Sequence, residues 1–213
     1  PMSQVAVCML GALSLFGASP EADILVGVNY FAGWWEPLPN KWHGKDGKDW
    51  RPSFPDRIPL LGEYNGQEVM DREIAAAADH GVDFFAVLCY YNPPGTEREP
   101  NARFLERGLK DFMSSPNAPR MRFMIEFCNH PPYLVSTEEE WRECVAYWVT
   151  CMKHPSYLRV GGKAVFKVHG GHFFMKQNAE DLGRCRDRLD YLRAEARASG
   201  VGELLIGCGI GAS

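Results

Sequence analysis

Residues 121–130 read MRFMIEFCNH, an almost unbroken apolar run that contains one carboxylate and ends in polar residues. Such a run is typical of a strand that is covered on both faces, as in a parallel sheet. Glu126 interrupts the run and shares one face of the strand with Met124 and Cys128. Because an unpaired buried carboxylate costs several kcal/mol, we expect Glu126 to have either partners or a function.

Four more segments outside this run have the same strand-like composition, at residues 24–30, 82–89, 163–168 and 204–208. Amphipathic segments between them predict helices over residues 68–80, 102–114 and 178–199 and after Thr137, which forms a capping box with Glu140. The last helix should bury an apolar stripe of Leu182, Cys185, Leu189 and Leu192. Strands that alternate with helices predict βα units and a parallel sheet.

The spacing of the predicted strands indicates the fold class. They begin about every 45 residues, so eight repeats would need about 360 residues, which is within the range of (β/α)₈ barrels. We therefore expect residues 23–213 to form an incomplete (β/α)₈ TIM-type barrel with about five strands. The alternative is a doubly wound sheet, but the chain has no G-x-G-x-x-G or G-x-x-x-x-G-K-[ST] motif to bind a nucleotide.

Composition limits the classes of function. The chain is 46% hydrophobic and 12% aromatic, which suffices for a core, and its net charge of -4 argues against a nucleic-acid partner. Its seven cysteines include no C-x-x-C pair, which favours buried thiols over a zinc ribbon or a disulfide framework.

The N-terminal segment is expected to be a leader. Residues 5–18 are an apolar run that is too short to span a bilayer but fits the core of a signal peptide. Residues 1–22 are therefore predicted to direct a secreted or periplasmic protein that does not stay inserted in the membrane. The alternative is a hydrophobic leader strand or helix.

The predicted site lies where the strands end, because barrel enzymes bind their substrates at the carboxyl ends of the strands. Aromatic, amide and imidazole side chains near a carboxylate are typical of a sugar site, and a carbohydrate is the partner we expect. Besides Glu126 as the catalytic acid, the predicted substrate-binding residues are Tyr30, Trp34, Trp35, Tyr90, Tyr91, Asn129, His130 and His169. Two alternatives remain open: the aromatic residues could anchor loops, and Glu126 could form an ion pair with Arg122 or Lys167.

A metal site is a further alternative, formed by Glu126, His130, His169 and His172. The histidines do not follow the H-E-x-x-H spacing of zinc hydrolases, so we predict neither a metal nor another cofactor.

Several segments together resemble the glycoside hydrolase family 99-like group, which includes endo-α-mannosidases and WbsX-like domains of polysaccharide loci. The matching segments are VGVNYFAGWW at 26–35, PLLGEYN at 59–65, AADHGVDFF at 77–85, MRFMIEFCNH at 121–130 and MKHPSYLRVGGKAVFKV at 152–168. The resemblance implies a (β/α)₈ barrel that hydrolyses glycosidic bonds. It also implies that Glu126 contacts the sugar and that Tyr30, Trp34 and Tyr91 line subsites.

The family's principal carboxylates lie late in the chain, in a W-N-E-W-x-E-like segment that this sequence lacks. Because glycoside hydrolysis generally uses two carboxyl groups, we expect these residues to be the N-terminal part of an enzyme, inactive alone, whose catalytic pair follows further along. A non-catalytic carbohydrate-binding barrel and a metal-dependent barrel hydrolase are the alternatives. The sequence leaves the oligomeric state open.

Overall fold

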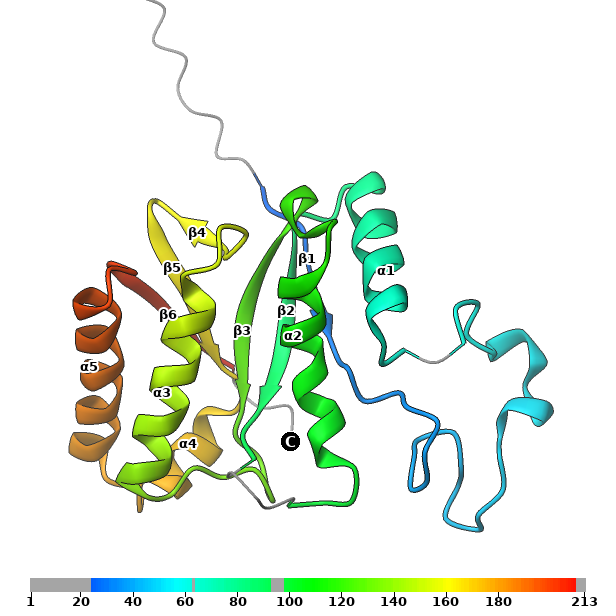
Figure 1. The fold of residues 1–213 in the computed structure, drawn as a ribbon. Coiled ribbons are helices and arrows are strands. Elements are labelled where there is room, and N and C mark those ends of the chain that lie inside the picture. The colour runs from blue at the N-terminus through cyan, green and yellow to red at the C-terminus, as the bar shows by residue number, and fades with distance from the viewer. Residues whose placement is uncertain (1–23, 63, 93–97, 210–213) are drawn as a thin grey trace, which may run out of the picture.

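The computed structural model describes residues 24–62, 64–92 and 98–209, in which strands and helices alternate along the chain (Figure 1). The strands are β1 (Gly27–Tyr30), β2 (Phe84–Tyr90), β3 (Arg122–Cys128), β4 (Arg159–Val160), β5 (Lys163–Val168) and β6 (Leu204–Cys208). The α-helices are α1 (Gln67–Asp79), α2 (Arg107–Ser114), α3 (Glu138–Met152), α4 (Gly171–Gln177) and α5 (Leu182–Ala198). Short 3₁₀ helices are η1 (Arg51–Ser53), η2 (Pro55–Arg57), η3 (Ala102–Glu106) and η4 (Ala118–Arg120). The predicted leader at residues 1–22 lies outside the described residues.

The strands form one six-stranded, mostly parallel sheet. Parallel pairs join β1 to β2, β2 to β3, β3 to β5 and β5 to β6, so neighbouring strands follow one another in chain order. The five predicted strands are confirmed to within a few residues. The short strand β4 was not predicted; it pairs antiparallel with the start of β5 across a turn in which Gly161 and Gly162 have positive φ.

The two faces of the sheet differ in what covers them. On one face, alternate residues of β2, β3, β5 and β6, such as Phe123, Ile125 and Phe127, pack in the main core with side chains of all five described α-helices. Figure 1 shows α2 and α3 lying across the central strands. On the other face, which we call the inner face, Ala86 and Met124 belong to a smaller apolar cluster. The helices therefore cover one face, and Glu126 lies on the inner face, in register with Lys167 of β5.

This arrangement is a mixed α/β fold, compatible with an incomplete α/β fold of the predicted kind. A doubly wound sheet carries helices on both faces and reverses its strand order, and neither feature occurs in the described part of the chain.

The helix ends show where local sequence decided the structure. The predicted capping box before α3 is confirmed: Thr137 Oγ1 accepts a hydrogen bond from the Glu140 backbone at 3.1 Å, and Glu140 Oε2 accepts one from the Thr137 backbone at 3.1 Å. The predicted helix over 178–199 starts later, because Asp181 caps α5 by accepting from Gly183 and Arg184. Leu182 consequently lies at the very start of the helix and is 70% exposed, so its predicted burial was wrong.

No helix in the described ranges is both long and apolar enough to cross a membrane.

The helix-covered core makes a first prediction about stability. Phe112 of α2 is fully buried, with its ring 4.8 Å from that of Phe123 and 6.1 Å from that of Phe85. Phe112→Ala should lower the free energy of unfolding by about 3–5 kcal/mol, because it removes apolar contacts and leaves a cavity. Leu182→Ala, at an exposed position, should change it by less than about 0.5 kcal/mol. Urea unfolding followed by circular dichroism measures both, and equal effects would contradict this description of the core.

Candidate functional site

The candidate site is centred on Glu126, whose side chain is fully buried on the inner face of the sheet. Its Oε1 atom accepts a hydrogen bond from His169 Nδ1 at 2.7 Å and forms an ion pair with Lys167 Nζ at 2.8 Å. The second oxygen, Oε2, is also buried but has no partner among the described residues. The proposed ion pair with Lys167 therefore exists, yet it satisfies only half of the carboxylate.

The two partners of Glu126 connect it to the surface. The side chain of Lys167 is 33% exposed and that of His169 is 40% exposed, whereas that of Glu126 is 1% exposed. A buried carboxylate normally has hydrogen-bond donors for both oxygens, because an unsatisfied charged acceptor loses its hydration without compensation. The described residues therefore leave one oxygen of Glu126 without a donor, shielded from solvent beside two partly exposed side chains.

The backbone that carries His169 is held by Asn129, at the end of β3. The Asn129 side chain is fully buried, donates from Nδ2 to the Gly170 carbonyl at 2.9 Å and accepts from the Gly170 N–H at 3.0 Å. Asn129 was predicted to bind substrate. In the structure, its Nδ2 and Oδ1 atoms both hydrogen-bond the backbone of Gly170. We conclude that Asn129 acts on the site through the position of His169.

An aromatic pocket of about 330 Å³ lies at the carboxyl ends of β1, β2 and β3. It contains three predicted residues, Trp35, Tyr90 and His130. The His130 ring centroid lies 5.7 Å from that of Tyr90 and 6.3 Å from that of His169, so His130 connects the pocket to the Glu126 cluster. The pocket also includes residues that the sequence did not single out: Phe31, Lys41, Glu99 and Tyr133.

The other predicted aromatic residues lie elsewhere. Tyr30 is on the helix-covered face, where its hydroxyl donates to Glu73 at 2.7 Å and where burial raises the pKa of the phenol. Trp34 packs its ring 4.7 Å from that of Trp42. Tyr91 donates to Glu143 of α3 at 2.5 Å. For these three, the contacts in the structure fit the alternative that aromatic residues anchor loops and helices.

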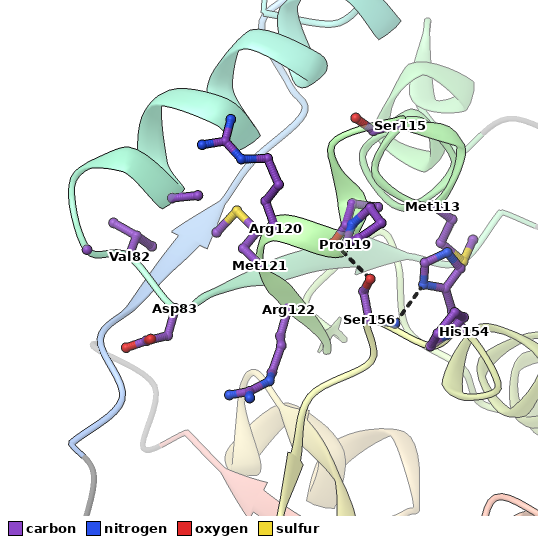
Figure 2. Close-up of a pocket in the computed structure, with 14 residues that line it drawn as sticks. Val82, Asp83, Met113, Ser115, Pro119, Arg120, Met121, Arg122, His154 and Ser156 are labelled. Carbon is purple, nitrogen blue, oxygen red and sulfur yellow. Dashed lines mark hydrogen bonds between the residues drawn. The ribbon is translucent and has the colours of Figure 1, made fainter.

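A larger pocket, of about 600 Å³, lies at the opposite, amino-terminal ends of the strands (Figure 2). Its polar groups are used locally: His154 Nδ1 accepts from the Ser156 N–H at 3.1 Å, and Ser156 Oγ donates to the Ala118 carbonyl at 2.8 Å. Figure 2 shows the guanidinium groups of Arg120 and Arg122 pointing in different directions. Because its charged groups do not converge, this pocket is a poorer candidate than the Glu126 cluster.

The metal-site alternative lacks a set of ligands. Across residues 24–62, 64–92 and 98–209, no three His, Cys, Asp or Glu side chains are grouped so that they could hold a metal ion. His172 instead packs its ring 3.8 Å from that of Phe173.

A scan against models of known protein families finds no match to this chain, and a search of curated proteins finds none either.

The thiol next to the site gives a second prediction. Burial raises the pKa of Cys128 to about 12, although its hydrogen bond with Tyr90 acts in the opposite direction. At pH 8 the thiol should therefore be protonated as well as inaccessible, and iodoacetamide should leave Cys128 unmodified in the native protein. The exposed Cys208 is the control and should be alkylated first. Peptide mass spectrometry measures both sites; alkylation of Cys128 as fast as Cys208 would contradict the burial of this part of the site.

Proposed function

We propose that this chain forms part of a secreted, glycan-acting (β/α)₈-barrel protein of the glycoside hydrolase family 99-like type, in which Glu126 contacts the sugar. The observation that carries the proposal is the buried Oε2 atom of Glu126, which has no hydrogen-bond partner within residues 24–62, 64–92 and 98–209 and lies next to His169 and Lys167. A sugar hydroxyl is the kind of neutral donor that this oxygen lacks. The apolar run at residues 5–18 supports export of the protein.

The sheet supports the barrel part of the proposal. Its parallel strands lie side by side in the order of the chain, and the helices cover one face. A sheet of this kind closes into a barrel when further βα units are added. In such a barrel the inner face of the sheet becomes the interior. Glu126, Lys167 and His169 would then lie in the upper part of the interior, where barrel enzymes bind their substrates.

The aromatic pocket supports a carbohydrate rather than another polar ligand. Tyr90, Tyr133 and His130 form a group of edge-to-face rings, with centroids 4.9–5.9 Å apart, beside the carboxylate cluster. Sugars present apolar C–H faces that pack on aromatic rings and hydroxyl edges that need charged or planar hydrogen-bonding groups. A pocket of rings connected by His130 to a carboxylate offers both surfaces side by side.

One observation favours the second candidate function, a barrel that binds carbohydrate without cleaving it. Glu126 is the single acidic residue in the described strands. Hydrolysis generally needs two carboxyl groups on either side of the glycosidic bond, and the described strands provide one, while the carboxyl of Glu99 in the aromatic pocket accepts a hydrogen bond from Tyr133 at 3.1 Å. Release of reducing ends from a bound glycan would identify a hydrolase, and binding without release would identify the non-catalytic form.

Binding of oligosaccharides to the purified chain tests the proposal. A panel of neutral and acidic oligosaccharides, including α-mannosides, is measured by calorimetry against wild type and Glu126→Gln. We expect at least one oligosaccharide to bind, and Glu126→Gln to weaken it by about 10- to 100-fold, because hydrogen bonds to a charged group contribute about 1.5–3 kcal/mol.

Glu139→Gln provides the matched control, because Glu139 is exposed in the first turn of α3. It should bind the oligosaccharide as wild type does. Circular dichroism must show that both variants are folded. The proposal fails if no oligosaccharide binds, or if Glu126→Gln binds as tightly as Glu139→Gln.

A further inference from the structure

We propose that His169 is the proton acceptor of this site, held by Glu126 so that its Nε2 atom takes a proton from a sugar hydroxyl. The inference depends on the proposed function for its substrate and goes beyond it, because it assigns a role in proton transfer to a residue so far treated only as a contact. It is built on one juxtaposition: a partly exposed imidazole hydrogen-bonded through Nδ1 to a fully buried carboxylate.

The partner of Nδ1 fixes the form of the ring. Glu126 Oε1 lies 2.7 Å from His169 Nδ1, and an ionised carboxylate can only accept hydrogen bonds. Nδ1 must then carry the hydrogen. In a neutral imidazole this leaves Nε2 with a free lone pair, as in catalytic and metal-binding histidines whose other nitrogen donates to a carboxylate.

The geometry also leaves Nε2 free of the carboxylate, in a side chain that is partly exposed. Nδ1 faces the carboxylate, which is shielded from solvent, while the side chain as a whole is 40% exposed. Nε2 is therefore the ring nitrogen of this partly exposed side chain that the carboxylate does not occupy. The His130 ring, with its centroid 6.3 Å away, places the aromatic pocket on this side of the cluster.

The backbone of His169 is fixed from both sides, which keeps the ring in place without cost at the moment of reaction. Its N–H donates to the Phe127 carbonyl at 2.9 Å, and the next residue, Gly170, is held by Asn129. Gly209 approaches so closely that a Cβ there would lie 2.2 Å from the His169 carbonyl oxygen. Asn129 and Gly209 are therefore positioning residues.

The chemical step is a single proton transfer. The hydroxyl O–H bond breaks, the proton forms a new bond to Nε2, and the electron pair stays on the sugar oxygen, which becomes a stronger nucleophile. The resulting imidazolium is stabilised by the negative charge of Glu126. Lys167 shares the same carboxylate oxygen, at 2.8 Å, and so partly neutralises that charge.

Two other histidines are internal controls. His130 Nδ1 lies 2.9 Å from the Pro131 carbonyl, so it has the same tautomer as His169 but a neutral partner. His154 Nδ1 accepts from the Ser156 N–H at 3.1 Å, so its hydrogen is on Nε2, the opposite tautomer. Comparing these rings separates the effect of the carboxylate from that of the tautomer.

Acylation by diethyl pyrocarbonate, in which the lone pair of an unprotonated imidazole nitrogen attacks a carbonyl carbon of the reagent, tests the inference without needing turnover when it is run at a pH at which the imidazoles are neutral. Rates at each histidine are read by peptide mass spectrometry. We expect the order His169, His130, His154, and we expect Glu126→Gln to lower the rate at His169 relative to His130 by about fivefold or more. Lys167→Met should raise that ratio, because it leaves the carboxylate with His169 alone.

The inference is overturned if His169 reacts no faster than His130 in the wild type, or if neither Glu126→Gln nor Lys167→Met changes the ratio in folded protein. An oligosaccharide that binds should protect His169, and binding without protection would also overturn it. If no oligosaccharide binds but the reactivity pattern holds, the proposed function fails while the pairing of Glu126 with His169 stands.

Discussion

The burial of the Glu126 carboxylate is the constraint on which the rest of the site depends. A charge removed from water must be compensated locally, and here His169 and Lys167 provide that compensation through a single oxygen. The pairing is possible because parallel register places Lys167 next to Glu126 on the neighbouring strand. The other oxygen, Oε2, remains without a donor among the described residues, and from this observation we propose a binding site in addition to the ion pair.

The two faces of the sheet differ in composition: one carries the main core and the other carries the candidate site. Large apolar side chains, such as Phe123 and Phe127, are buried under the helices and give the chain its main core. The inner face carries a smaller apolar cluster and, toward the carboxyl ends of the strands, the polar groups of the site. The helix-covered face supplies the main core, whereas the inner face holds a carboxylate with one oxygen unsatisfied among the described residues.

Local patterns in the sequence predicted most of the elements, and tertiary contacts decided the roles of single residues. The capping box at Thr137 was predicted because its two partners are three residues apart. The exposure of Leu182 was missed because the cap at Asp181 moved the helix start. Alternation along the strand placed Glu126 on one face, but its pairing with His169 depends on the register of distant strands. Likewise, no local sequence pattern indicates that the side chain of Asn129 hydrogen-bonds the backbone of Gly170, 41 residues further along the chain.

The most direct test of the central claim is the protonation of the two ring nitrogens of His169, measured by a long-range proton–nitrogen correlation spectrum of the nitrogen-labelled protein as the pH is raised until the ring is neutral. The signals are assigned by their loss in His169→Gln. If Glu126 holds the ring as described, Nδ1 carries the hydrogen and Nε2 shows the shift of an unprotonated nitrogen. A ring protonated on Nε2 with a bare Nδ1 would contradict the pairing on which the site is built.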